Sequence, residues 1–308
     1  MKLRHKLSLA GALCALLLPV TTAQADAVSP KTYNVWQWNV AGDSIHDGRT
    51  DTGMVDAAVG SIVYRGADFA ALNELCENQY DALVAKLRIE NWPQNADNFA
   101  RFEPSRQGGN KAICKNGAYG NAIFSKRPLG PADRIALPDD GTAEKRNMLC
   151  AGLLDGSGTR FCTTHITKEL AFSTAQLDAV HTQLEAHSGE SVLIAGDFNA
   201  QPDYGRLNTF YTASANTPNN PNNAGEYREL DDNDEGQCLG YGEWTVEGSG
   251  SNTPPCGPNA KIDLIFVRES ALAGPYSADS LGISAGCTYV PGGLCSDHRI
   301  LTGTVTVK

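Results

Sequence analysis

The chain has 308 residues, of which 41% are hydrophobic and 19% charged, and its formal net charge is −10. This composition suits a large globular domain with a well-buried core. The negative charge excludes binding of nucleic acid by bulk electrostatics alone, although bound cations and local Arg and Lys residues could still neutralise a polyanionic substrate.

The first 25 residues have the features of a secretory signal peptide. They combine a basic start, an apolar middle and the small-residue pattern AQA at residues 23–25, which predicts cleavage before Asp26. Loss of the three Lys and Arg residues of this leader would take the net charge from −10 to −13. We expect a secreted, extracellular protein in which residues 1–25 are removed and residues 26–308 form a single domain. No later apolar run is long enough to cross a bilayer, so we expect no stable membrane association. We also expect a monomer.

The cysteines predict disulfides. Nine cysteines less Cys14 of the leader leave eight, an even number in an exported chain. The segments RNMLC and TRFCTTHI flank the turn DGSG, and this hairpin would place Cys150 opposite Cys162. By proximity along the chain we also expect the pairs Cys76–Cys114, Cys238–Cys256 and Cys287–Cys295.

Apolar, β-branched segments alternate with helical patterns through the chain. Strands are predicted at residues 33–41, 69–75, 121–126, 148–154, 160–166, 191–199, 261–268 and 300–307. Apolar residues at helical spacing predict helices within residues 50–66, 78–90 and 169–187. In the third of these helices, Ser173 and Gln176 match a capping box.

Residues 204–260 are rich in Asn, Pro, Gly and acids and are too long for an ordinary connector. We call this segment the excursion and expect it to be ordered and held by Cys238 and Cys256. Its DDNDEG sequence, residues 231–236, resembles the start of a calcium loop. Gly242 occupies the position of the closing bidentate Glu, so we interpret DDNDEG as a solvated acidic turn.

The stretch LIAGDFNAQPD begins as a buried strand and then becomes polar at Asp197. A carboxylate buried behind such a strand costs several kcal/mol unless it is paired or bound to a metal. Asp197 is therefore predicted at the end of the strand, facing a site. Side chains two residues apart on a strand share a face, which predicts that Asp197 and Asn199 share a pocket while Phe198 packs in the core.

Seven short motifs place polar or charged residues at the end of an apolar segment. In chain order they are QWNVAG with Asn39, ALNELC with Glu74, YGNAIFSK with Tyr119 and Asn121, CTTHI with His165, AGDFNAQPD with Asp197 and Asn199, KIDLIF with Asp263, and CSDHRI with Asp297 and His298. Each motif is weak by itself, because an Asp or Asn at the end of a strand caps a turn more often than it catalyses.

In this order the motifs resemble the endonuclease/exonuclease/phosphatase superfamily, typified by pancreatic-type deoxyribonuclease, over about Tyr33 to Val307. GDFNA and the terminal SDH are the most specific pieces. The resemblance implies an α+β fold of the deoxyribonuclease I-like type, a four-layer α/β/β/α sandwich with the active site at one edge of its two sheets. It also implies that the protein is an enzyme, a metal-dependent phosphodiester hydrolase.

The resemblance assigns a role to most of these residues. Glu74 is the first metal ligand, with Asn39 and Asp297 as further ligands of Mg²⁺ or Mn²⁺, because hard cations prefer oxygen donors. Asp197 and Asn199 would orient the attacking water and hold a phosphate oxygen. Asp263 and His298 would be a carboxylate–histidine pair, and the sequence leaves open whether Asp197 or the histidine takes the proton from water.

Further residues are expected to contact phosphate. His165 matches a second histidine that has an acidic partner in nucleases of the family, and the sequence does not identify that partner here. Arg146 fits the position of a phosphate-binding arginine, although a surface charge at the start of a strand explains it equally well. Tyr119 and Asn121 complete the predicted phosphate contacts.

The family includes enzymes with different substrates, and the sequence favours a nuclease acting on DNA, with RNA as an alternative. Inositol phosphatases usually have a Cys-Asp-Arg motif that is absent at Asp263. Bacterial sphingomyelinases share KID and SDH, but they present an exposed aromatic hairpin that this sequence lacks. A sphingomyelinase-type enzyme and a non-catalytic binding or toxin-like subunit remain as alternatives. Export, acidic surplus and the excursion motivate a second hypothesis, a structural Ca²⁺.

Overall fold

The computed structural model describes residues 29–107, 113–248, 255–283, 287 and 294–308. The predicted leader lies outside these residues. No helix in the described ranges is both long and apolar enough to span a membrane.

The strands form two six-stranded sheets. The first has the order β11 (Leu272–Leu281), β12 (Ile300–Val307), β1 (Lys31–Asn39), β2 (Phe69–Cys76), β4 (Tyr119–Ser125) and β3 (Ala100–Arg106). The second has the order β5 (Leu129–Ala136), β6 (Asn147–Leu153), β7 (Thr159–His165), β8 (Ser191–Asp197), β10 (Asp263–Arg268) and β9 (Tyr227–Glu229). All eight predicted strands are present.

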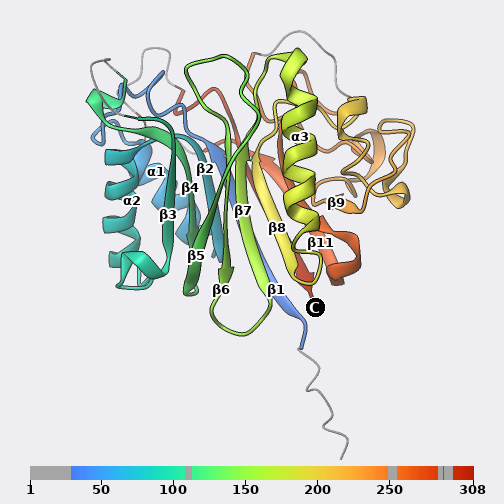
Figure 1. Ribbon diagram of the computed structural model, residues 1–308, viewed down its shortest axis with the longest axis horizontal. Coiled ribbons are helices and arrows are strands. Elements are labelled where there is room, and N and C mark those ends of the chain that lie inside the picture. Colours follow the sequence, from blue (N-terminus) through green and yellow to red (C-terminus); the bar gives the residue numbers. More distant parts are fainter. Residues whose placement is uncertain (1–28, 108–112, 249–254, 284–286, 288–293) are drawn as a thin grey trace, which may run out of the picture.

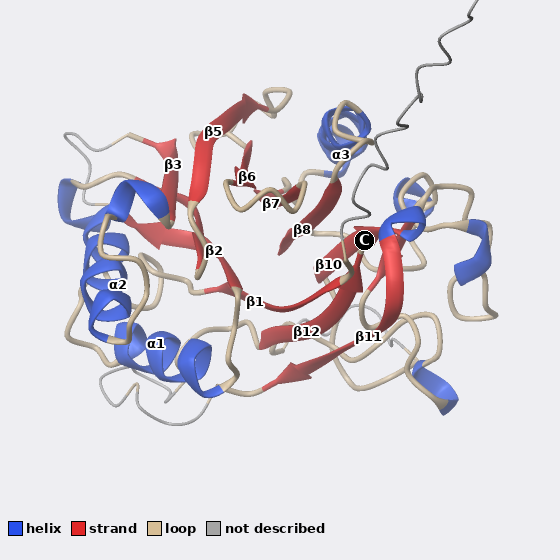
Figure 2. Ribbon diagram, turned by 90° about the horizontal axis from the view of Figure 1, so that it is seen from below, coloured by secondary structure: helices blue, strands red, loops and turns tan. Residues whose placement is uncertain are grey.

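Helices cover the outer faces of both sheets, and the predicted four-layer sandwich is confirmed (Figures 1 and 2). The helices α1 (Met54–Tyr64) and α2 (Glu77–Ile89) lie on the first sheet, and α3 (Leu170–Glu185) lies on the second. Buried side chains such as Phe69, Phe161 and Leu193 fill the space between the sheets. Short 3₁₀ helices span Ala96–Asn98, Cys114–Asn116, Gly205–Leu207, Ala213–Ala215, Gly236–Cys238 and Glu269–Ala271.

Four strands were not predicted, and they are the four edges of the two sheets: β3, β5, β9 and β11. Three of them contain a proline, namely Pro104, Pro131 and Pro275. Proline removes a donor from the ladder and is tolerated mainly on edge strands. These strands therefore lack the apolar alternation by which the eight central strands were predicted.

The predicted capping box of α3 is wrong. The helix begins at Leu170 with Glu169 as its N-cap residue, so Ser173 lies inside the helix and is buried. Gln176 instead holds the loop that precedes the helix, because its Oε1 accepts from the backbone N of Thr167 at 2.9 Å.

All four predicted disulfides are present: Cys76–Cys114, Cys150–Cys162, Cys238–Cys256 and Cys287–Cys295. Cys150 and Cys162 face each other directly on β6 and β7, as the predicted hairpin requires.

The interpretation of DDNDEG as a solvated acidic turn holds for Asn233, Glu235 and Gly236, which are exposed, but is wrong for its first two residues. Asp231 and Asp232 are 0% and 2% exposed. Nζ of Lys261, also 0% exposed, lies 2.6 Å from Oδ2 of Asp231, and Nε of Arg228 lies 2.8 Å from Oδ2 of Asp232. Each buried carboxylate thus has a cationic partner, and that pairing is what makes its burial tolerable.

Candidate active site

The strand register brings three predicted site residues together. Asp197 ends β8, its neighbour on the parallel strand β7 is His165, and its neighbour on the antiparallel strand β10 is Asp263. His298, just before β12, contributes a fourth. Its Nδ1 lies 2.8 Å from Oδ2 of Asp263 in a hydrogen bond, and its Nε2 lies 3.8 Å from Oδ2 of Asp197.

The charges in this cluster depend on one another. Burial raises the pKa of Asp197 to about 7, and the neighbouring Asp263 carboxylate adds to the increase. Burial acts against the charged form of His298, but the charge and hydrogen bond of Asp263 outweigh it and raise the pKa of His298 to about 10. At neutral pH His298 is therefore an imidazolium that faces Asp197.

The sequence predicted that Asn199 reaches the site by strand alternation. The strand β8 instead ends at Asp197, and Asn199 reaches the site by a turn. Its backbone is left-handed, with φ 45°, and its N donates to Oδ1 of Asp197 at 2.9 Å. Asn tolerates this conformation better than most residues. Phe198 packs in the core against Phe210 and Phe266. Asp197 and Asn199 do line one cavity, as expected.

His165 has the acidic neighbour that the sequence left unassigned. Its Nδ1 lies 3.4 Å from Oε1 of Glu144, in the loop between β5 and β6. The contact is electrostatic, because Nδ1 makes no hydrogen bond to the described residues. Nδ2 of Asn199 lies 3.2 Å from Nε2 of His165, so Nε2 is the acceptor and a neutral ring carries its proton on Nδ1, facing Glu144.

Burial sets the charge states of this second pair. It lowers the pKa of His165 well below the usual value, and the positive charges of Arg146 and His298 lower it further. Burial raises the pKa of Glu144 to about 7, against the opposing effect of Arg146. The His165 ring is therefore neutral at pH 7, while Glu144 changes charge near that pH.

Glu74 and Asn39 form the part of the site that fits a divalent cation. Glu74 has a left-handed φ of 57° and lies at a register shift between β2 and β4, an irregularity that re-aims a side chain. Its Oε1 accepts from Nδ2 of Asn39 at 3.0 Å, and the same Nδ2 lies 3.1 Å from Oδ2 of Asp197. The ligands would be a carboxylate oxygen of Glu74 and Oδ1 of Asn39, which also accepts from the backbone N of Ala41 at 3.2 Å. Completed by water, they are a donor set that Mg²⁺ accepts.

Asp297 is not brought to Glu74 or Asn39 by any contact among the described residues. Its side chain is exposed, with Oδ1 3.5 Å from Oγ of Ser296. Asp297 instead adds to the rise in the pKa of His298. Oxygen or nitrogen atoms of Asp197, Asp263 and His298 lie within 4.8 Å of one another, but the imidazolium already supplies the positive charge there.

Asn121, which the sequence predicted to bind phosphate, is not among the described residues that line the cavity. Asn121 is 0% exposed and its amide is used within the protein: Oδ1 accepts from Asn73 at 2.9 Å, and Nδ2 donates to Asn147 at 2.9 Å. Tyr119 is also buried and hydrogen-bonds Glu74, which together with burial raises the pKa of its phenol. Both residues are buried and hold neighbouring side chains in place by hydrogen bonds.

A buried polar network, which the sequence did not reveal, fixes Asp197 and Asp263. Nε2 of Gln37 donates to Oδ1 of Asp263 at 2.9 Å and to Oδ1 of Asn73 at 3.3 Å. Oδ1 of Asn73 also accepts from the backbone N of Asp197 at 2.9 Å. The available signal was a polar residue inside an apolar strand, as in VWQWN, because such a residue needs buried partners.

Arg146 lies at the cavity and is already paired. Its Nη1 donates to Oε1 of Glu144 at 2.7 Å, and its Nε lies 3.8 Å from Oδ2 of Asp140. Its side chain is 8% exposed, so it is not the surface charge that the sequence allowed as an alternative.

These groups line a cavity of about 370 Å³. Of the predicted residues it includes Glu74, Arg146, His165, Asp197, Asn199 and His298. Glu144 and two further cations that the sequence did not single out, Arg106 and Lys168, also line it.

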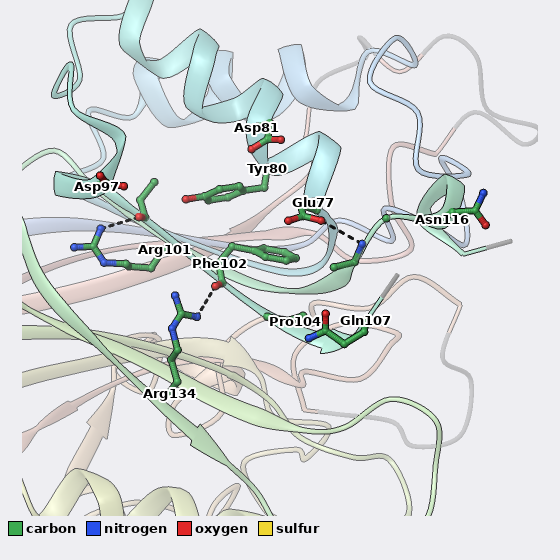
Figure 3. Close-up of a pocket in the computed structure, with 13 residues that line it drawn as sticks. Glu77, Tyr80, Asp81, Asp97, Arg101, Phe102, Pro104, Gln107, Asn116 and Arg134 are labelled. Carbon is green, nitrogen blue, oxygen red and sulfur yellow. Dashed lines mark hydrogen bonds between the residues drawn. The ribbon is translucent and has the colours of Figure 1, made fainter. Parts of the chain in front are cut away.

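A larger hollow of about 740 Å³ lies between α2 and β3 (Figure 3). Tyr80 and Phe102 form its floor, with ring centroids 5.3 Å apart. Its two arginines, Arg101 and Arg134, are bonded to backbone carbonyl oxygens, and three acids also line it. The smaller cavity is therefore the candidate site, because it alone holds the carboxylate and histidine cluster.

The fold and the site define a metal-dependent phosphodiester hydrolase. Residues 36–298 match the Endonuclease/Exonuclease/phosphatase family, and the chain belongs to this family. Among curated proteins, the chain is similar to the uncharacterized protein YbhP of Escherichia coli K12, with 30% identity over 130 residues. That match covers 38% of this chain and 48% of YbhP, so it spans about half the length of this relative.

Solved structures of the family have the same fold. The human Nocturnin catalytic domain with bound sulfate has a TM-score of 0.64 at 17% identity, covering 90% of this chain and 94% of that chain. A family protein from Bacteroides thetaiotaomicron has a TM-score of 0.60 at 14% identity, covering 91% and 99%. TDP2 from D. rerio, complexed with a single-strand DNA product, has a TM-score of 0.58 at 17% identity, covering 89% and 98%.

Proposed function

We propose that the protein is an exported, metal-dependent nuclease that hydrolyses phosphodiester bonds in DNA, with RNA as an alternative substrate. One observation carries the proposal: Asp197 is enclosed by two histidines and the Glu74–Asn39 pair at the wall of a cavity lined by several cations. The D. rerio TDP2 structure with its DNA product supports nucleic acid as a substrate for this fold.

Glu74 and Asn39 would hold the metal, which when bound would neutralise charge on the phosphate and on the leaving oxygen. Asp197 then has the role of the proton acceptor for water, since Asn199 N and Asn39 Nδ2 hold both of its oxygens in place. His298 would hold a phosphate oxygen through Nε2–H, while Asp263 fixes its ring.

His165 completes the site on the opposite side. Once Nε2 gains a proton, the ring would donate a hydrogen bond to a second phosphate oxygen or pass that proton to the leaving oxygen. Glu144 would stabilise the ring whenever it gains a second proton, because its carboxylate already lies 3.4 Å from Nδ1.

Hydrolysis of supercoiled plasmid, linear DNA, RNA and sphingomyelin, each with Mg²⁺ and with EDTA, tests the proposal. We expect plasmid nicking that EDTA abolishes. If nucleic acids stay intact and phosphocholine is released from sphingomyelin, the result would support the alternative, a sphingomyelinase-type enzyme that uses the same site. Full biological effect in a His298→Ala variant would instead support the non-catalytic alternative.

We further propose that the protein works outside the cell. Four disulfides suit an oxidising compartment, and the leader at residues 1–25, followed by one catalytic domain at 26–308, remains a prediction. Mass spectrometry of the protein recovered from culture medium should give an N-terminus at Asp26.

A structural Ca²⁺ remains a separate hypothesis, now with candidate ligands in the excursion. Carboxylate oxygens of Asp231, Asp234 and Glu243 lie within 4.8 Å of one another, and Oδ1 of Asp231 is buried without a hydrogen-bond partner. Ca²⁺ bound to the folded state would raise the melting temperature. An unchanged melting temperature after addition of EGTA would count against it.

A further inference from the structure

Two cations that line the active-site cavity have no hydrogen-bond or ion-pair partner for their side chains among the described residues. Four cationic side chains line this cavity, and two of them are paired: Arg146 is bonded to Glu144 and His298 to Asp263. Arg106 and Lys168, by contrast, make no side-chain hydrogen bond and no ion pair within 4.0 Å in the described ranges of the chain. Arg106 is close enough to Glu144 to lower the pKa of that carboxyl.

The fold holds both cations beside the Glu144–His165 pair. Arg106 is the last residue of β3, and the preceding Ser105 accepts through its backbone O from N of Lys145, in the Glu144 loop, at 2.8 Å. Lys168 follows His165 by three residues, in the loop that Gln176 fixes through the backbone N of Thr167 at 2.9 Å. The side chains make no hydrogen bond to the described residues, but backbone hydrogen bonds hold the segments that carry them.

One diester phosphate does not require these two charges. It carries one negative charge, and the contacts proposed above for His298, Arg146 and the metal already serve it. The chain as a whole is negatively charged, at −10, so unpaired cations at the cavity have a local role in attracting further anions. A cavity of about 370 Å³ also exceeds the size of a single phosphate group.

We propose that Arg106 and Lys168 form a second phosphate subsite, which binds the phosphate next to the scissile one in a nucleic acid strand. The inference rests on the proposed nuclease function and specifies its substrate as a chain with more than one phosphodiester. Among the described residues that line the cavity none is Phe, Tyr or Trp, the side chains that commonly recognise a choline cation. Glu169 has the opposite charge and also lines the cavity.

The test compares substrates that have one phosphate with substrates that have several. Arg106→Gln and Lys168→Gln each remove one charge from the subsite. Lys126→Gln is the matched control, because it removes the same charge from an exposed position. Lys126 follows Ser125, the last residue of β4, whereas Tyr119 is the first residue of that strand. The substrates are bis(p-nitrophenyl) phosphate, which has one diester, and a single-stranded decanucleotide, both assayed with Mg²⁺ over a range of salt concentrations.

We expect each subsite variant to raise KM for the decanucleotide roughly tenfold and to reduce the salt dependence of log KM by about 0.7. Hydrolysis of bis(p-nitrophenyl) phosphate should stay within about twofold of wild type. Lys126→Gln should match wild type on both substrates, and Glu169→Gln should leave KM for the decanucleotide unchanged or lower.

Equal losses on both substrates would overturn the proposal, because the residues would then serve the scissile phosphate or the fold. Unchanged kinetics on both would overturn it as well. Failure of the nuclease function gives a different result: wild type would cleave bis(p-nitrophenyl) phosphate or sphingomyelin and leave the decanucleotide intact.

Discussion

Two of the buried clusters among the described residues each combine two carboxylates and one cation, and they differ in their access to solvent. In the active site His298 lies 2.8 Å from Asp263 and 3.8 Å from Asp197. In the second cluster Lys261, which directly follows the excursion, lies 2.6 Å from Asp231 and 3.5 Å from Glu229, and all three are 0% exposed. Of these two clusters, the first borders the candidate-site cavity.

The difference lies in access to the cavity. Burial alone would lower the pKa of Lys261, but Asp231 and Glu229 raise it above its usual value, so the lysine stays charged. Its two carboxylates still have raised pKa values, that of Glu229 at about 7. The pKa of Asp197 is also about 7, but Asp197 lines the cavity, and a carboxylate with a raised pKa that faces a cavity is a candidate for chemistry.

The largest expected effect is that of His298→Ala on activity. We expect kcat/KM to fall about a thousandfold, because the imidazolium that faces Asp197 is lost. The melting temperature should also fall, because the buried carboxylate of Asp263 loses its cation, so activity is measured at a temperature at which the variant is folded. His187→Ala, on the surface beside Glu190, is the control and should keep full activity. If folded His298→Ala kept the activity of wild type, the active-site cluster would be structural like that around Lys261.

Lys261→Met should have the second largest effect, on stability. It leaves the buried carboxylates of Asp231 and Glu229 without a cation, which costs about 3–5 kcal/mol in the free energy of unfolding. Urea denaturation at pH 7 measures the change. Lys86→Met, which removes an exposed ion pair with Asp56, should cost less than about 1 kcal/mol. Similar values for both variants would contradict the comparison.

Glu144→Gln should have a smaller effect that depends on pH. The pKa of Glu144 is about 7, and Gln resembles its protonated form. We expect kcat/KM to equal that of wild type at pH 5.5 and to be roughly tenfold lower at pH 8.5. An activity ratio that stays constant with pH would show that the Glu144 carboxylate does not act on His165.

The same variant gives a stability prediction with a definite sign. The pKa of Glu144 is raised in the folded state from 4.5 to about 7, so protonated Glu144 favours folding. Wild type should therefore lose stability relative to Glu144→Gln as the pH rises from about 4.5 to about 7. Urea midpoints at both pH values measure this difference.

The central strands could be predicted from the sequence, and the edges could not. Strands buried on both faces, such as β8, are continuous apolar runs. The edge strand β3 contains Arg101, Glu103 and Pro104, since one side of its ladder needs no partner. Its strand character comes from pairing with β4.

Local motifs likewise predicted one part of the site and missed the other. Asp197, Asp263 and His298 stand in compact motifs, and the resemblance to the family gave them roles. Glu144 and Arg106 have no motif of their own. They become visible only where separate segments meet at the cavity.

The sequence by itself determined the central strands, the helices, the disulfide partners and the chemical types of the main site residues, because each depends on local periodicity, spacing or a short motif. Tertiary structure decided which charges are compensated. It paired His165 with Glu144 and Asp231 with Lys261, and it left Arg106 and Lys168 facing the cavity. Coulombic energy and burial depend on distances in space, and residues far apart in the chain set those distances only after the two sheets have packed together.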